Sequence, residues 1–587
     1  MTGSDPIGQS LERVEDAALV TGQPAFVADL PEARGALHVA ILRAPVASAR
    51  LRAIDTRAAA AKPGVRAVLT AQDMPDVRPL PCDWFPPGEG SPVLHPILAR
   101  ERIAYHGQPV AAVAAETRAA ALDALDAIAL DLVGTPAIVD QAAALSPDAP
   151  RVHPDRPGNL AFRYARAGGD VAAAFGKADI TFSLRLINNR ITAAALEGRA
   201  VLSRPAPGSD MLEHWSSTQL PHVHARALAH CLSFPLNRLR FRVPSVGGGF
   251  GSKLAFYAED VICAALALRA EAACLWVEER REGFLSTTHG RDHVQEVEVA
   301  ATRDCRVLGL KARLIADMGA FALGMGPGIA AFNAGHSLTG PYDIRAISFA
   351  VEGVYTNRTP TGPYRGAGHP EATYLIELVM EAVAQRTGLD PVTVRRRNLV
   401  TAAQMPYRLA TGLDLDTGDY GALPDATLAR ADHNGLIRWR DGRRQAGTLA
   451  GVGVALFSEN SAAAPSIGMG AMGFARAGHE SARHRPPRRP GYGVQRRAGV
   501  GSGAPHDPRP DRGCGTCRAA RRSRRPGSIA GRNGRGLGGC DCPNSSSGGS
   551  VMLRILRQHF GLIWRAAMSA RRMLMAGSSM RRIPACL

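Results

Sequence analysis

Two glycine-rich segments carry the residue types best suited to binding a ligand: VPSVGGGFGSK at 243–253 and TNRTPTGPYRGAGHPEA at 356–372. Because ordering glycine costs conformational entropy, such clusters indicate positive-φ turns or backbone that closely approaches a ligand. We predict that each segment precedes a helix, where free N–H groups and the helix dipole attract an anion. Arg365 adds a planar guanidinium suited to an anion. Together the segments predict one large anionic ligand held between them, although the first alone also fits a tight turn that packs a helix against a sheet.

The first segment matches neither common nucleotide-binding fingerprint. A P-loop needs Gly-Lys-Ser/Thr after four spacers, whereas Lys253 here follows Ser252 and precedes Leu254. The pattern G-x-G-x-x-G also fails, because counting from Gly247 places Ser252 where the last glycine belongs.

Apolar periodicity supplies the elements that would position these segments. A predicted strand over 240–246 enters the first segment, and a predicted helix over 253–270 leaves it. A long amphipathic helix over 368–390 follows the second segment and ends near Gly388.

The N-terminal part shows the same mixture of elements. Residues 104–115 predict a turn into a buried strand, and 116–132 predict an alanine-rich helix. A linker rich in Pro and Asp at 145–159 separates this part from the rest. We therefore predict an α+β protein with at least two domains.

The net charge of +18 belongs to the C-terminal end of the chain. Residues 478–587 contain 22 Arg and 4 acidic residues, so the preceding part is neutral overall. Residues 476–587 also lack apolar periodicity, so we predict a disordered tail rich in Arg, Gly and Pro. Composition of this kind is typical of GC-rich DNA translated in a shifted frame, and we expect a frameshift near residue 475. The alternative is a non-enzymatic protein that binds nucleic acid through this tail.

Cysteines and hydropathy indicate the compartment. Five cysteines are scattered in mostly apolar surroundings, which suits a reducing cytoplasm better than a disulfide framework. Neither a signal peptide nor a spanning apolar run is evident, so no membrane partner is expected. Cys514, Cys517, Cys540 and Cys542 have a spacing that could form a Cys₄ zinc site. The sequence around them lacks the signals of an ordered domain, so we do not expect this site to form.

Ordered motifs along most of the chain resemble one enzyme family. They include residues 7–30, HGQPVAAVAAE at 106–116, STQ at 217–219, WVEERREGFLSTTHGRD at 276–292, LTGPYDI at 338–344 and both glycine-rich segments. This series is similar to the large, molybdopterin-binding subunit of the xanthine dehydrogenase, aldehyde oxidase and aerobic carbon-monoxide dehydrogenase family. The resemblance implies an α/β hammerhead domain over 1–144, a first molybdopterin-binding domain over 145–475 and an aberrant tail over 476–587.

The resemblance also implies the site residues. In the first segment and before it, Gln219, Gly248, Gly249, Phe250 and Gly251 match residues beside the molybdenum centre. In the second, Arg365, Gly366 and Ala367 match the loop around the family's arginine. The molybdenum itself would be held by the pterin, with no direct protein ligand.

A catalytic residue is missing from this pattern. Family members insert water-derived oxygen into a C–H bond with a glutamate as general base, in a G-x-G-E stretch of a second cofactor domain. The present sequence contains no G-x-G-E, so we assign no catalytic residue and expect this chain to be inactive or unable to hold the cofactor.

Departures from the family pattern narrow the range of expected substrates. Purine-oxidising members have Glu where Leu254 stands and Phe where Ala367 stands. The loop YRGAGH at 364–369 has no cysteine, so it lacks the thiolate that holds copper in carbon-monoxide dehydrogenases. The resemblance to the YRGAG branch implies an aldehyde or an aromatic heterocycle as the substrate.

The sequence lacks motifs for the electron-transfer cofactors, which predicts partner subunits that carry them. It has no C-x₄-C-x₂-C cluster for a [2Fe–2S] centre and no flavin fingerprint. By resemblance, electrons would pass to a small iron–sulfur subunit and a medium FAD subunit, and the pterin would be in the cytosine dinucleotide form.

Several polar residues have simpler interpretations. We predict that Glu197 pairs with Arg199, that 278–281 form a solvated face, that His224 lies near a helix start, and that His289 makes a structural hydrogen bond.

Overall fold

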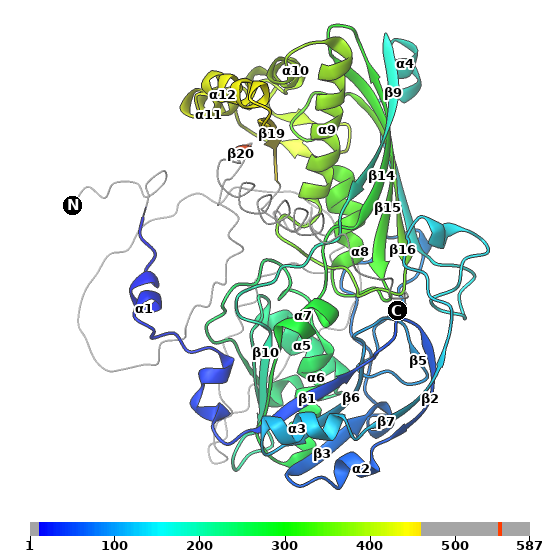
Figure 1. Cartoon of the computed structure of the whole chain (residues 1–587), viewed down its shortest axis with the longest axis vertical. Coiled ribbons are helices and arrows are strands. Elements are labelled where there is room, and N and C mark those ends of the chain that lie inside the picture. The colour runs from blue at the N-terminus through cyan, green and yellow to red at the C-terminus, as the bar shows by residue number, and fades with distance from the viewer. Residues whose placement is uncertain (1–10, 460–549, 555–587) are drawn as a thin grey trace, which may run out of the picture. The chain divides into compact units, whose positions relative to one another are not determined.

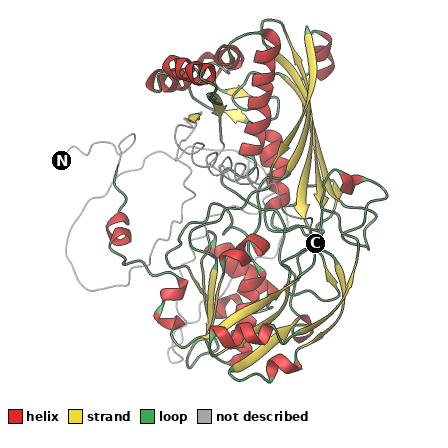
Figure 2. Cartoon of the chain, viewed as in Figure 1, coloured by secondary structure: helices red, strands yellow, loops and turns green. Residues whose placement is uncertain are grey.

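The computed structural model describes residues 11–459 and 550–554 (Figure 1). Mixed sheets and helices alternate through these residues, as Figure 2 shows, which confirms the predicted α+β class. No helix in the described ranges is long and apolar enough to cross a bilayer.

A seven-stranded mixed sheet takes strands from both predicted domains. In spatial order these are β12 (Leu239–Arg242), β11 (Leu212–Ser216), β10 (Ala200–Pro205), β13 (Cys274–Val277), β1 (Leu37–Arg43), β6 (Pro109–Ala115) and β3 (Val65–Thr70). The parallel pairing of β1 with β13 joins the N-terminal strands to the rest. The division at residue 144 stays a prediction, and one sheet spans it.

Strand β6 shows why its sequence has no polar alternation. Every residue of PVAAVAA is buried. Ala112 and Ala114 pack in the core that includes α6 (Ala258–Ala270), whereas Ala111 and Val113 pack in the core that includes α3 (Arg118–Leu125). With helices on both faces, a continuous apolar run is the expected pattern.

A second sheet has one buried face and one polar face. Its order is β4 (Glu89–Gly90), β8 (Leu160–Gly168), β16 (Ala346–Tyr355), β15 (Val307–Gly319), β14 (His293–Ala301) and β9 (Ile180–Asn188). Helix α9 (His369–Thr387) packs against β9 and β14 and contributes Leu375, Val379 and Val383 to the core (Figure 1). Helix α9 ends at Gly388, which has φ +69°, as predicted for a glycine C-cap.

Smaller elements complete the described part. The remaining strands are β2 (Ala49–Asp55), β5 (Arg102–Ile103), β7 (Ala129–Gly134), β17 (Tyr407–Arg408), β18 (Asp414–Leu415), β19 (Gly453–Phe457) and β20 (Ser550–Arg554). The remaining α-helices are α1 (Asp16–Val20), α2 (Arg57–Ala60), α4 (Val171–Gly176), α5 (Pro221–Cys231), α7 (Arg280–Ser286), α8 (Gly326–Gly328), α10 (Pro391–Asn398), α11 (Ala422–Arg430) and α12 (His433–Gln445). A π-helix spans Ile329–Ala334.

Two predicted helices were wrong in extent. The helix predicted over 116–132 ends at Leu125, because the alternating sequence of β7 pairs with β2 instead. The helix predicted over 253–270 begins at Ala258, because residues 251–254 form a turn, closed by a hydrogen bond from the Leu254 N–H to the Gly251 carbonyl, and the N-cap Tyr257 is extended. Tertiary contacts override helix propensity in both cases.

Most of the predicted tail, and with it the zinc and nucleic-acid hypotheses, lies outside the described residues. The exception is Ser550–Arg554, which forms β20 and pairs antiparallel with β19.

Candidate cofactor site

The first glycine loop, residues 247–253, has the backbone of an anion-binding nest. Gly248, Phe250 and Gly251 have φ of +92°, +51° and +95°. In the described structure the amides of Gly248, Gly249 and Phe250 donate no hydrogen bond to the protein. Successive free N–H groups with alternating φ make a concave anion site.

Gln219 is fixed against this loop. Its carboxamide oxygen accepts a 3.0 Å hydrogen bond from the Gly251 N–H, and the backbone N–H of Gln219 donates to the Lys253 carbonyl at 2.9 Å. A Cβ on Gly249 would lie only 2.5 Å from that carboxamide oxygen. Glycine is therefore required at 249 for Gln219 to approach.

The second glycine loop, residues 363–368, leads directly into α9. Gly366, Ala367 and Gly368 all have positive φ, of +90°, +41° and +97°. The exposed Arg365 precedes them. Gly368 is the N-cap of α9, so the helix dipole favours an anion here, whereas α6 begins too far from the first loop for the same argument.

The structure brings the two loops into direct contact. The Arg365 N–H donates to the Phe250 carbonyl at 2.9 Å. A Cβ on Gly251 would lie 2.8 Å from the Pro363 carbonyl carbon. Both loops also hold a non-glycine residue, Phe250 or Ala367, in the left-handed region. Such backbone strain is concentrated at ligand sites, where the surrounding structure maintains it.

Sequence reasoning missed Arg291, which holds the second loop. Its guanidinium donates to the carbonyls of Tyr364 (3.2 Å) and Arg365 (2.7 Å) and pairs with Glu371 at 3.1 Å. The side chain is 8% exposed and lies over the Tyr364 ring. Arg291 and Asp292 both have φ +67°, a backbone conformation that their residue types do not predict.

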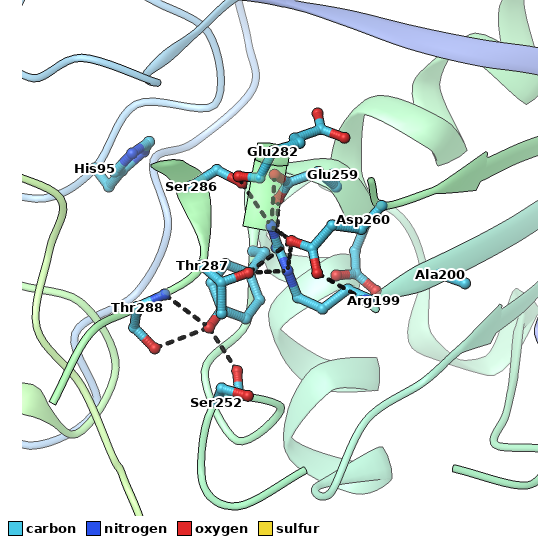
Figure 3. Close-up of polar contacts among 12 residues, drawn as sticks. His95, Arg199, Ala200, Ser252, Glu259, Asp260, Glu282, Ser286, Thr287 and Thr288 are labelled. Carbon is cyan, nitrogen blue, oxygen red and sulfur yellow. Dashed lines mark hydrogen bonds and ion pairs between the residues drawn. The ribbon is translucent and has the colours of Figure 1, made fainter. Parts of the chain in front are cut away.

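A buried charge network lies behind the first loop, where Figure 3 shows Arg199 in contact with Glu259, Ser286 and Thr287. Arg199 pairs with Glu259 at 2.9 Å and with Glu278 at 2.8 Å. The predicted Glu197–Arg199 pair is therefore wrong. The predicted solvated face is also wrong for Glu278, whose side chain is 7% exposed.

The network connects to the loop through Tyr257. The Arg199 guanidinium lies 3.8 Å from the centroid of the Tyr257 ring, a cation–π contact. The Tyr257 hydroxyl donates to the carbonyl of Ser252, within the first loop. Arg43 of β1 extends the network by pairing with Glu259 and Glu282 at 2.7 and 2.6 Å.

We expect this network to make stability depend on acid pH. Burial would raise the pKa of Glu259, but Arg199 and Arg43 lower it from 4.5 to about 2. A carboxylate with a lowered pKa in the folded state stabilises above its unfolded pKa, and that contribution is lost as pH falls from about 4.5 towards 2. In urea unfolding between pH 6 and 3, E259Q should start less stable and decline less than wild type. An equal decline in both proteins would contradict the assignment.

The histidine predictions are confirmed. His224 lies in the first turn of α5, with its ring nitrogen Nε2 3.0 Å from the Leu254 carbonyl. His289 Nε2 lies 3.0 Å from the Phe284 carbonyl. In the described ranges no group of three or more His, Cys, Asp and Glu residues is placed to hold a metal ion.

Cysteines of the described part are free thiols. Cys231, Cys263, Cys274 and Cys305 are buried, and Cys82 is partly buried. Burial raises the pKa of Cys274 to about 12, so this thiol stays protonated at neutral pH.

Two family models match the chain. The model of the molybdopterin cofactor-binding domain matches residues 152–399, which include both glycine loops. The model of the aldehyde oxidase and xanthine dehydrogenase a/b hammerhead domain matches residues 21–134. These matches define a cofactor-binding protein of the molybdenum-dependent oxidoreductase class. The chain belongs to the large-subunit family of xanthine dehydrogenase, aldehyde oxidase and carbon monoxide dehydrogenase, which confirms the resemblance.

Individual relatives show similarity over the same region. The nicotine 6-hydroxylase large subunit of Paenarthrobacter nicotinovorans is 32% identical over 460 residues, 78% of this chain and 56% of the relative. The carbon monoxide dehydrogenase large chain of Hydrogenophaga pseudoflava is 33% identical over 472 residues, 77% of this chain and 58% of the relative. The crystal structure of quinoline 2-oxidoreductase from Pseudomonas putida 86 aligns with TM-score 0.73 and 29% identity, covering 78% of this chain and 58% of that one.

The chain spans only 56% and 58% of the two curated relatives above. Another relative is matched over most of its own length. The nicotinate dehydrogenase large molybdopterin subunit of Eubacterium barkeri is 29% identical over 419 residues, and the match covers 70% of this chain and 92% of that subunit. A chain that consists almost entirely of the matched region therefore exists among the relatives.

Proposed function

We propose that this chain is the molybdopterin-binding large subunit of a molybdenum hydroxylase. The observation that carries the proposal is the contact between the two glycine loops, made by the Arg365 N–H and the Phe250 carbonyl. The free amides of residues 248–250 and the exposed residue Arg365 lie on these two loops. Such a donor set fits an anionic pterin cofactor that carries oxo and phosphate groups.

Each residue group has a distinct part in this proposal. Gly248, Gly249 and Phe250 would bind the cofactor through their backbone amides. Gly251, whose amide donates to the carboxamide of Gln219, would hold the loop beside that side chain. Arg365, Gly366 and Ala367 would bind it from the second loop. When bound, the cofactor supplies the oxygen transfer and the two-electron chemistry. The chain's own residues bind and orient it.

We propose no general base in this chain, because the sequence lacks the G-x-G-E stretch that carries the family's glutamate. Glu459 Oε1 lies 3.1 Å from the position that a Cβ on Gly366 would take. The carboxylates of Glu197 and Glu371, also next to the loops, are held in ion pairs with Lys253 and Arg291. Neither is available to take a proton from an attacking oxygen. We therefore expect no turnover from this chain alone.

We propose an aromatic nitrogen heterocycle or an aldehyde as the substrate. Relatives named for nicotine, quinoline and nicotinate support the heterocycle. Leu254 and Ala367 leave no polar anchor or aromatic stack at the positions where purine oxidisers have them. The YRGAGH loop offers no thiolate for copper.

The partners proposed are a small iron–sulfur subunit and a medium FAD subunit. The carbon monoxide dehydrogenase and nicotine 6-hydroxylase relatives are named as large chains or large subunits, which supports an assembly of several subunits. We further propose the cytosine dinucleotide form of the pterin and a cytoplasmic location, the latter supported by the free buried thiols.

Pterin retention tests the proposal. The full chain, expressed in a host that makes the cofactor, should purify with bound pterin, measured by fluorescence after oxidation, and with molybdenum, measured by mass spectrometry. R365M removes a charged donor worth about 1.5–3 kcal/mol, so retained pterin should fall roughly 10- to 100-fold. R345M is the matched control, because Arg345 is also exposed and pairs only with Asp343 among the described residues. Wild-type protein without pterin under these conditions would contradict the proposed function.

A further inference from the structure

We propose that Glu197 and Lys253 form a clasp that fixes both ends of the first glycine loop, so that they are positioning residues for its free amides. The role towards a cofactor rests on the proposed function, whereas the clasp itself is a property of the loop.

One carboxylate oxygen joins the first and last residues of the loop. Glu197 Oε2 accepts a hydrogen bond from the Gly247 N–H at 2.6 Å and another from Lys253 Nζ at 2.8 Å. The Glu197 N–H also donates to the Gly247 carbonyl at 3.1 Å. A Cβ on Gly247 would lie 2.5 Å from the Glu197 Cβ, so this approach requires glycine at 247.

Burying the ammonium of Lys253 costs desolvation free energy. Its side chain is 1% exposed, and burial lowers its pKa although Glu197 acts in the opposite direction. Glu197 is its one ion-pair partner in the described part of the chain. A buried ammonium with a single carboxylate contributes little net stability, because desolvation offsets the attraction. The pair is therefore better explained by the geometry that it imposes than by stability.

The clasp restricts the backbone of Gly248, Gly249 and Phe250, because these residues lie between the two ends that it fixes. Their amides have no acceptor in the described structure, so no hydrogen bond of their own fixes the direction of these N–H groups. Glycine-rich backbone without such bonds samples many conformations. Fixing the loop ends in advance reduces the entropy lost when a ligand binds.

Hydrogen exchange on the cofactor-free full chain tests the clasp directly. The Gly251 N–H donates to Gln219 and the Ser252 N–H donates to the Gly249 carbonyl, so both amides report on loop order. In E197A these two amides should exchange at least about tenfold faster than in wild type. In K253M, which replaces the buried ammonium by an apolar chain of similar length and leaves the Glu197 carboxylate 18% exposed, exchange of Ser252 should also rise about tenfold.

The matched control is E352A. Glu352 is a similarly buried carboxylate of β16 that pairs with Arg163 and Arg313. Its loss should lower stability and leave exchange in the loop unchanged. Retained pterin should fall at least about tenfold in E197A and K253M and stay at the wild-type level in E352A.

Failures of the two proposals are distinguishable. Slow loop exchange in E197A and K253M, equal to wild type, would overturn the clasp even if wild-type protein carries pterin. Fast exchange in both variants, with no pterin in wild type, would support the clasp and overturn the proposed function.

Discussion

Replacing Arg199 by methionine should lower the free energy of unfolding by about 3–5 kcal/mol, because it leaves the buried Glu278 without a cation and Glu259 with Arg43 alone. Arg199 is 5% exposed and pairs with Glu259 and Glu278. Its guanidinium also donates to the hydroxyls of Ser286 and Thr287. Methionine fills a similar volume, so the loss measures charge and hydrogen bonds more than packing. Urea unfolding of the full chain, followed by circular dichroism, gives the difference.

Two further variants separate the causes. R57M removes an arginine whose side chain is 90% exposed and pairs with Asp55, so the loss of stability should be much smaller than in R199M. The triple variant R199M/E259Q/E278Q also neutralises the carboxylates of Glu259 and Glu278, so it should recover part of the free energy of unfolding lost in R199M. If R199M were no worse than R57M, the buried network would not hold this region together.

Features encoded locally were predictable from the sequence. Helix α9 has apolar residues at helical spacing, a glycine N-cap and a glycine C-cap, and its predicted end at Gly388 is observed. Strand β6 was predictable because a short apolar run bounded by turn residues fits a strand buried on both faces. The glycine loops were predictable as loops, because few other residues adopt their backbone conformations.

Partners distant in sequence were not predictable. Glu259 and Glu278 lie 60 and 79 residues from Arg199, and the run EERRE gives no sign that its first glutamate is buried. Glu197 was assigned to the nearest cation in sequence, Arg199, whereas the fold carries it to Lys253. Periodicity identifies which face of an element is apolar, but it does not identify which charges meet after folding.

The same limit applies to the site. Arg291 lies in a stretch that matches the family, yet nothing local indicates that its guanidinium binds two carbonyls of the second loop. The first loop is held by the carboxylate of Glu197, the second by the guanidinium of Arg291. Each loop thus has a charged side chain of its own that bonds to its backbone, and the loops meet between these two supports. Their contact is therefore the feature on which a cofactor site would depend most.

Replacing Gly251 by alanine should break that contact and give the largest loss of cofactor. Gly251 has φ +95°, and a Cβ would lie 2.8 Å from the Pro363 carbonyl carbon and 3.0 Å from the Tyr364 nitrogen. These atoms are backbone, so the loops must separate to relieve the overlap. Left-handed strain of about 1–2 kcal/mol adds to an overpacking cost of about 1–3 kcal/mol. Separation would also lengthen the Arg365 N–H to Phe250 hydrogen bond, so retained pterin should fall more than about tenfold.

G208A is the matched control, because Gly208 has φ +66° and nothing lies within 4 Å of its Cβ position. It should cost only the left-handed strain of about 1–2 kcal/mol and keep wild-type pterin. Comparing the two variants by thermal unfolding and pterin fluorescence therefore isolates the loop contact from backbone strain. Equal pterin in G251A and G208A would show that the contact between the loops is not what holds the cofactor.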